Sequence, residues 1–325
     1  TFFSQEGLDH LPPFLSRLAL HGYMPWTPED IEKLPRELLS LELVGTANLD
    51  DECLSALPRT LTHLGFSFTK KSPISNQGLS FLPSTLQSLD LRNCEKLLAS
   101  SFAVLPVNLT SLKIGGPDMV IDVPEAKQLP RGLTSLDFNN VEIRSNNAFT
   151  AFPRYLLRLL VILRSRHYIS DGCASMLPPS LTYLYLACPE RHAVSWNDRF
   201  LERLACRRTL RTLHLSPHNG LTDVCAPFLP RTLTDLDLGY AIKMTETTLA
   251  ALPPDLTRLN VRSWNWFSTA QIQMLPRNLD TLILNQSGLI TNDSLRALPP
   301  KLTHLELQSS PLLTDEAFQY LPAGL

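Results

Sequence analysis

The sequence predicts an α/β solenoid in which successive repeats each add one β-strand and one short helix. A Leu-Pro step recurs about every 23 residues, as at Pro230, Pro253 and Pro276. Each step is followed by Leu-x-x-Leu-x-Leu, and a residue of helix-capping type stands eight positions before its proline. No single unit of this kind can bury its own leucines, so the units must stack. We therefore expect a curved, horseshoe-shaped solenoid with a parallel β-sheet on its concave face and short helices on its convex face.

The helix of each repeat is predicted by the residues at its two ends. The segment Thr27-Pro28-Glu29-Asp30 is the clearest start, because a capping side chain is followed by a proline and by acidic residues near the positive end of the helix. The proline of the Leu-Pro step then ends the helix after about two turns. The capping positions are Ser4, Thr27, Asp50, Ser75, Asp122, Ser145, Ser170, Asn197, Thr222, Thr245, Ser268, Thr291 and Thr314, with Leu98 as the exception.

The strand of each repeat is predicted by its alternating leucines, for example Leu86, Leu89 and Leu91. Alternate side chains of a strand point to one face, so the leucines face the helix and the residues between them face the open side. A right-handed parallel β-helix is the competing solenoid, but its turns lack a capped helical segment of this length. The leucines are therefore the predicted core, and the residues between them are free to serve another purpose.

The composition fits one elongated domain over residues 1–325, with about 13 complete repeats. Because the chain begins just before a cap and stops at the first leucine of a further strand, we expect it to be a fragment of a longer chain. It contains 29 Lys and Arg against 31 Asp and Glu. This balance predicts no nucleic-acid partner, and the sequence has no run of about 18 apolar residues that would indicate membrane insertion.

The six cysteines lie far apart and form no Cys-x-x-Cys pair. Small secreted domains cluster their cysteines in a disulfide framework, so this spacing favours a cytoplasmic location. Asn-x-Ser/Thr triplets at Asn108, Asn285 and Asn292 would be glycosylated only on the secretory route, and such triplets also arise by chance. Three cysteines share the third position after a cap, which indicates a packing role: Cys53, Cys173 and Cys225.

The open-face residues vary from repeat to repeat. The row between the second and third leucines is Ala19, Glu42, Gly65, Asp90, Lys113, Asp137, Leu160, Tyr185, His214, Asp237, Asn260, Ile283 and Glu306. Acidic groups outnumber basic groups along it, and the preceding row restores the balance. We expect Asp235 beside Arg258 and Asp237 near Arg262 as cross-strand neighbours. Solvated pairs of this kind contribute about 0 to 1 kcal/mol and need not mark a recognition site.

One part of the open face departs from polar chemistry. Large apolar, aromatic and arginine side chains coincide there on two successive strands, which is the composition of an interface hot spot. The alternative is that the first of these strands is locally shifted or covered by a neighbouring segment. The predicted partner-binding residues are Leu157, Arg158, Leu160, Ile162, Tyr183 and Tyr185, with Asp137 and His214 on the rim.

The repeat lengthens between Ala187 and Leu210, where we expect a loop. Aromatic residues directly before a cap are predicted to be core, namely Trp26, Trp196 and Phe267. Two other tryptophans, Trp264 and Trp266, follow a strand, and we expect them to be exposed there.

No pattern in the sequence predicts catalysis. The nearest polar clusters are Ser216-Pro217-His218 and His214 with Asp237, and neither forms a Ser/His/Asp set, a phosphate loop or a pair of metal ligands. We therefore expect no catalytic residue, metal, cofactor or small-molecule substrate. The expected partner is a protein.

Repeated phrases connect the chain with known families. The phrase at 290–295 (Ile-Thr-Asn-Asp-Ser-Leu) and its equivalents at 169–174, 221–226 and 313–318 resemble the I-T-D-x-x-L phrase of the cysteine-containing leucine-rich repeat subfamily. That subfamily is common in F-box substrate adaptors, although its repeats tend to be longer and its strand-exit cysteine survives here mainly as Cys94. The L-P-x-x-L-T-x-L-x-L phrase at 298–307 also looks like the repeats of slime-mould FNIP proteins and of bacterial ubiquitin-ligase effectors.

These resemblances imply a leucine-rich repeat solenoid that binds proteins. The expected function is a protein-protein interaction scaffold with its partner on the concave face, and within it the substrate-recognition part of an SCF-type ubiquitin ligase. The alternative is an extracellular or surface recognition ectodomain, or the repeat domain of a host-directed effector. An F-box or a signal peptide in the native N-terminal region would distinguish the two.

Overall fold

The computed structural model describes residues 5–68, 73–92, 94–164, 169–188, 196–216, 220–262, 264–285 and 288–325. The chain divides into two compact units, Thr1–Tyr168 and Ile169–Leu325. The predicted cap Ser4 and the predicted cluster residues Pro217 and His218 lie outside the described residues.

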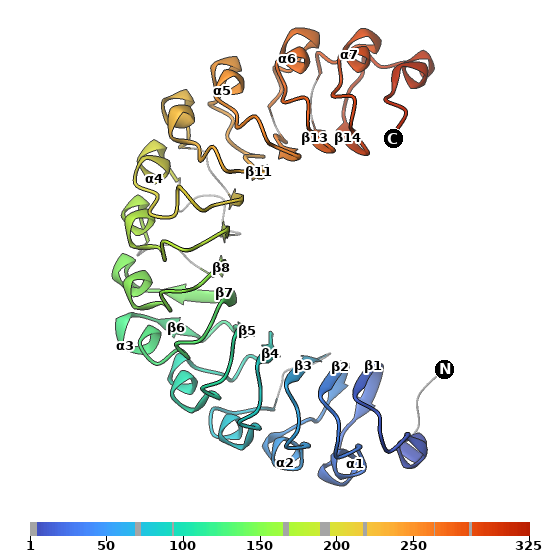
Figure 1. Ribbon diagram of the computed structural model, residues 1–325, viewed down its shortest axis with the longest axis vertical. Helices are drawn as coiled ribbons and strands as arrows, with labels where there is room; N and C mark the ends of the chain where they lie inside the picture. The colour runs from blue at the N-terminus through green and yellow to red at the C-terminus, as the bar shows by residue number, and fades with distance from the viewer. Residues whose placement is uncertain are drawn as a thin grey trace. The chain divides into compact units, whose positions relative to one another are not determined.

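The first unit contains a parallel sheet with the strand order β1-β2-β3-β4-β5-β7-β8, and β6 pairs with β7 outside this path. Its strands are β1 (Arg17–Pro25), β2 (Ser40–Ala47), β3 (His63–Phe68), β4 (Ser88–Leu91), β5 (Ser111–Ile114), β6 (Val120–Ile121), β7 (Ser135–Ile143) and β8 (Arg158–Leu163). Its α-helices are α1 (Pro28–Glu32), α2 (Asp51–Ser55) and α3 (Val123–Ala126), and its 3-10 helices are η1 (Gln5–His10), η2 (Gly78–Phe81), η3 (Ala99–Val104) and η4 (Asn146–Ala151). The three α-helices lie on one side of this sheet (Figure 1).

The second unit repeats this plan with the parallel strand order β9-β10-β11-β12-β13-β14. Its strands are β9 (Tyr183–Ala187), β10 (Thr212–Ser216), β11 (Asp235–Asp237), β12 (Arg258–Asn260), β13 (Thr281–Asn285) and β14 (His304–Gln308). Its helices are η5 (Asp171–Met176), α4 (Asp198–Glu202), η6 (Asp223–Phe228), α5 (Glu246–Ala250), α6 (Thr269–Gln273), α7 (Asn292–Arg296) and η7 (Asp315–Tyr320). Within the long repeat expected to loop out, α4 follows residues 189–195, which lie outside the described residues.

The predicted leucine core is confirmed, because each leucine pairs with the corresponding leucine of the next strand. Leu64 is in register with Leu89, and Leu89 with Leu112, while Leu236 is in register with Leu259 in the second unit. Leu89, Leu112, Leu236 and Leu259 are all 0% exposed. Parallel pairing in constant register places these side chains under the helices and leaves the residues between them on the opposite, open face of each sheet.

The α-helices are shorter than the two turns that the sequence predicts, and other repeats have a 3-10 helix in that place. The α-helices span four or five residues, as in α3 and α1. Where a 3-10 helix ends, the residue before the proline is already extended, with ψ of 143° at Leu105 and 147° at Leu177. Proline disfavours helical backbone at the preceding residue, and this leaves room for little more than one α-helical turn after the cap.

The predicted caps form locally. Thr27 makes a capping box, in which the Asp30 N–H donates to Thr27 Oγ1 at 3.3 Å and the Thr27 N–H donates to Asp30 Oδ2 at 3.1 Å. Asp50 accepts from the Cys53 N–H at 3.1 Å. Leu98, the exception in the sequence, has no side-chain acceptor of its own.

A second set of hydrogen bonds joins the caps of successive repeats, and the sequence analysis did not predict it. The residue after one cap accepts from the next cap: Asp198 accepts from the N–H and the hydroxyl of Thr222, both at 2.7 Å. Asp223 likewise accepts from the N–H and hydroxyl of Thr245 at 2.9 and 2.6 Å, and from Thr248 Oγ1 at 2.6 Å. Burial acts to raise the pKa of Asp223, but these hydrogen bonds outweigh it and leave the pKa lowered. The acidic residue of the I-T-D phrase therefore links repeats.

The aromatic core is larger than predicted. The predicted core residues Trp26, Trp196 and Phe267 are at most 2% exposed. Trp264, which was expected to be exposed, is 0% exposed, so that prediction is wrong. The chain turns after β12, with the Trp264 N–H donating to the Val261 carbonyl at 3.1 Å, and the Trp264 ring stacks 5.2 Å from that of Trp266. Trp266 is half-buried, and its indole N–H donates to the Met244 carbonyl at 2.9 Å.

Candidate functional site

The strand β8 places the predicted apolar residues on the open face of the first unit. Leu157, just before the strand, is 46% exposed, and Leu160 and Ile162 are half-buried. The intervening Leu159 and Val161 are 0% exposed. From Arg158 to Ile162 β8 stays in the leucine register of β7, and a register shift follows only between Ile162 and Leu163, so the predicted residues are not displaced by a shifted strand.

The predicted rim residue Asp137 is more deeply buried than a rim position implies. It lies on β7, in register with Lys113 of β5 on one side and with Leu160 of β8 on the other, and it is 8% exposed. No described residue donates a hydrogen bond to its carboxylate. Burial raises the pKa of Asp137, although the positive charges of Arg92, Lys113 and Arg158 act in the opposite direction.

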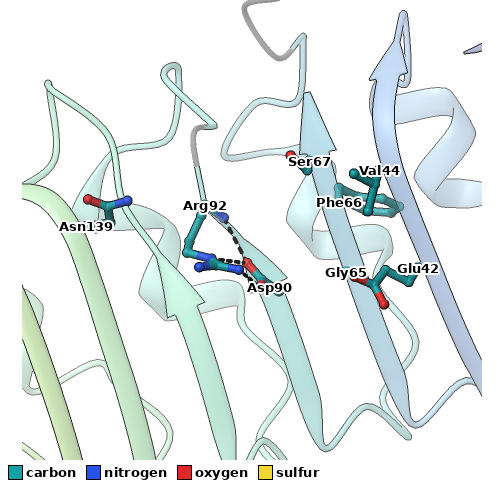
Figure 2. Close-up of a pocket in the computed structure, with 8 residues that line it drawn as sticks. All are labelled: Glu42, Val44, Gly65, Phe66, Ser67, Asp90, Arg92 and Asn139. Carbon is teal, nitrogen blue, oxygen red and sulfur yellow. Dashed lines mark hydrogen bonds and ion pairs between the residues drawn. The ribbon is translucent and has the colours of Figure 1, made fainter. Parts of the chain in front are cut away.

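Further along the same open face lies a hollow of about 300 Å³ that the sequence analysis did not predict. Its lining residues come from β2, β3, β4 with the turn after it, and β7, and Figure 2 shows them: Glu42, Val44, Gly65, Phe66, Ser67, Asp90, Arg92 and Asn139. Gly65 is in register with Glu42 on one side and Asp90 on the other. The signal was present in the sequence, because Gly65 is the one residue without a side chain in its row.

Of the two carboxylates at this hollow, one has hydrogen-bond and ion-pair partners among the described residues and the other has none. Asp90 accepts two hydrogen bonds from the Arg92 guanidinium, Nε to Oδ1 at 3.0 Å and Nη2 to Oδ2 at 2.8 Å, and Lys113 Nζ lies 3.3 Å from Oδ2. This contact with Asp90 raises the pKa of Arg92. Glu42 is exposed, and its carboxylate has no hydrogen bond or ion pair with any described residue.

In the second unit, the structure brings together three predicted residues. The ring of His214 on β10 lies 6.0 Å from that of Tyr183 and 5.9 Å from that of Tyr185, both on β9. All three side chains are half-buried on the open face. Burial raises the pKa of Tyr185, and the charge of Asp237 acts in the same direction. The rings form an aromatic surface that can bury area against a partner.

The acidic residues beside these rings already have partners. His214 is in register with Asp237, as the sequence suggested, but its Nε2 contacts Asp235 Oδ1 at 2.9 Å. The predicted pair of Asp235 and Arg258 forms, with Arg258 Nε 3.9 Å from Asp235 Oδ1. Asp237 accepts from Asn260 Nδ2 at 2.9 Å. It is not paired with Arg262, which lies 3.7 Å from Glu306 instead.

The predicted binding centre is therefore divided between the two units. Asp137, Leu157, Arg158, Leu160 and Ile162 belong to the first unit. The second unit contains Tyr183, Tyr185 and His214.

The cysteines have the environment of packing residues. All six are free thiols and buried. Burial raises the pKa of Cys53, Cys206 and Cys225 to about 12, and that of Cys173 still further. A nucleophilic or metal-binding cysteine needs an accessible thiolate, and the burial of these four thiols disfavours that form at neutral pH.

Two kinds of feature are absent from the described ranges. These ranges hold no group of three or more His, Cys, Asp or Glu side chains placed to bind a metal ion. In the same ranges, no helix has the length and apolar character needed to cross a membrane.

Solved structures share this fold at low sequence identity. A chain of the yeast Rad7 and Elc1 complex aligns with a TM-score of 0.60 and 23% identity, over 84% of this chain and 76% of that one. An internalin from Listeria monocytogenes aligns with a TM-score of 0.56 and 20% identity, over 99% of this chain and 88% of that one. A leucine-rich repeat protein from Leptospira interrogans aligns with a TM-score of 0.54 and 17% identity, over 86% of this chain and 74% of that one. No protein-family model and no curated relative matches the sequence. The fold is thus a leucine-rich repeat solenoid.

Proposed function

We propose that this chain is a scaffold that binds another protein through the open faces of its strands. The observation that carries the proposal is the accessibility of large apolar and aromatic side chains at positions that the core does not require. These side chains are Leu157, Leu160 and Ile162 in the first unit, and Tyr183 and Tyr185 in the second. Such residues, flanked by charged groups, dominate the affinity of protein interfaces.

The test is partner binding by open-face variants. The chain is used to capture a partner from its native cells, and the purified partner is then titrated calorimetrically against Leu160→Ala and Tyr185→Ala. Each variant should weaken binding by about 2 kcal/mol, or about 30-fold, with little change in the thermal midpoint. Tyr155→Ala is the control, because Tyr155 is 72% exposed and lies outside the strands. A purified partner that binds both strand variants as well as the wild type would contradict the proposal.

Within this function we propose the narrower role of a substrate receptor in an SCF-type ubiquitin ligase. Its support is the resemblance of the I-T-D phrases, for example at 290–295, to those of cysteine-containing repeats in F-box adaptors. The test is whether the full native chain co-purifies with ubiquitin-ligase subunits and promotes ubiquitin transfer to the captured partner. Co-purification with an extracellular or host protein and no ligase subunit would favour the alternative of a surface recognition domain.

We also propose that the repeats carry no reaction of their own and that the chain is cytoplasmic. The first proposal is supported by the His214 and Asp235 pair, in which the imidazole is bonded to the carboxylate and no described serine or cysteine contacts it. The second is supported by the six cysteines, which are buried as free thiols, the state expected of thiols in a reducing compartment.

A further inference from the structure

The hollow on the open face of the first unit exists because its row of side chains is interrupted by Gly65. A Cβ added there would lie 3.6 Å from Asp90 Cβ and 3.8 Å from Glu42 Cγ, which is ordinary van der Waals contact. The glycine is therefore not required by crowding, and its φ is not in the left-handed region. The backbone would accept a side chain at this position, and its absence leaves the space of about 300 Å³ open.

The lining of the hollow has the chemistry of a site for a cationic side chain. It includes two carboxylates, Glu42 and Asp90, and one guanidinium, Arg92; because Arg92 and Lys113 both contact Asp90, Glu42 is the carboxylate left without a described cationic partner. Arg92 donates two hydrogen bonds to Asp90, so part of its charge is already compensated. Glu42 has no partner among the described residues. Val44 adds apolar surface, which suits the methylene stem of lysine or arginine, whereas the Phe66 side chain is buried in the core at 3% exposed.

The row that crosses the hollow holds three carboxylates and one lysine. Across the strands it reads Glu42, Gly65, Asp90, Lys113, Asp137, and neighbouring strands of such a sheet are about 4.8 Å apart. Lys113 stands between two carboxylates but contacts Asp90, which Arg92 already binds. A cation over Gly65 would make negative and positive groups alternate along the row. Lys113 could then contact Asp137 instead of Asp90, and Asp137 is 8% exposed and has no hydrogen-bond donor among the described residues.

We propose that a partner protein inserts a lysine or arginine side chain into the hollow above Gly65, with its charged group between Glu42 and Asp90. The inference rests on the proposed function, because it assumes a protein partner on the open face. This site is separate from the apolar residues of β8, and it selects a cationic side chain.

The probe for the test is blocked arginine, N-acetyl-arginine methylamide, with the uncharged N-acetyl-citrulline methylamide as its isostere. Binding is followed by ¹H–¹⁵N NMR of the whole chain at low salt, from the amide shifts of Gly65 and Ser67. We expect saturable shifts with blocked arginine and about fivefold weaker binding of blocked citrulline, since a near-surface ion pair contributes up to about 1 kcal/mol, or about fivefold in affinity.

Three variants locate the site. Gly65→Leu should weaken binding of blocked arginine by about tenfold or more, because its side chain occupies the hollow. Glu42→Gln should weaken it by about fivefold, and because Glu42 is exposed this variant carries no folding risk. The matched control is Glu306→Gln, which removes a carboxylate from the same row in the second unit. It should leave binding unchanged.

Each contrary result has a distinct meaning. Equal binding of arginine and citrulline, unchanged binding by Gly65→Leu, or no saturable shift at Gly65 would each overturn the proposal. Tighter binding of spermidine than of blocked arginine would overturn the assignment to a protein side chain in favour of a free polyamine. None of these results bears on Leu160→Ala or Tyr185→Ala, so the scaffold function stands or fails separately.

Discussion

The open faces of the two units stand on the same framework but satisfy their charges differently. In the first unit, Asp137 is 8% exposed and accepts no hydrogen bond from a described residue. In the second unit, Asp235 accepts from His214 at 2.9 Å and Asp237 from Asn260 at 2.9 Å. In the second unit the aromatic rings are therefore the groups open to a partner, whereas in the first unit a partner can supply a donor to Asp137 that the described residues do not.

The largest expected effect tests the framework that the two faces share. Leu89→Ala in the first unit and Leu236→Ala in the second each remove a side chain that is 0% exposed. Each should lower the free energy of unfolding by about 2–5 kcal/mol, because the shortened side chain leaves a cavity in the packed core. The measurement is urea denaturation followed by circular dichroism. If the free energy of unfolding falls much less in one variant than in the other, the two units are not built on equivalent cores and the comparison of their faces fails.

An intermediate effect tests the hydrogen bonds between successive caps. Asp223→Ala removes the acceptor for Thr245 and Thr248 and should cost about 1–2 kcal/mol. Because these bonds lower the pKa of Asp223, the stability that they contribute is present above the unfolded-state pKa of about 3.9 and is lost as pH falls through the folded-state pKa. The difference between variant and wild type, measured by denaturation from pH 7 to pH 3, should therefore shrink in acid.

The smallest expected effect separates the two faces directly. Burial raises the pKa of Asp137, so its contribution to stability is present below about pH 3.9 and is lost as pH rises through the folded-state pKa. Asp137→Asn should then slightly stabilise the protein at pH 7, with the gain disappearing in acid. Asp235→Asn weakens the contacts with His214 and Arg258 and should destabilise it by about 0.5–1 kcal/mol. Loss of stability in both variants would show that Asp137 has a stabilising partner.

The fold and the core could be predicted from the sequence because they depend on local, repeated rules. Proline ends each helix, a capping side chain begins it, and alternate leucines face one side of a strand whatever its neighbours are. The same rules placed Leu160 and Ile162 correctly on the open face. They also located the predicted pair of Asp235 and Arg258, since cross-strand neighbours follow from the constant register.

What the sequence by itself determined is therefore the repeat, the register and the face on which each side chain lies. Only the tertiary structure decided which charges bond to which, because a side chain on a parallel sheet can reach donors on its own strand or on the neighbouring ones. Lys113 contacts Asp90 and not Asp137, His214 contacts Asp235 and not Asp237, and Trp264 stacks into the core through a turn that no period predicts. The hollow above Gly65 arises in the same way, since the absence of one side chain becomes a cavity only when both neighbouring strands are in place.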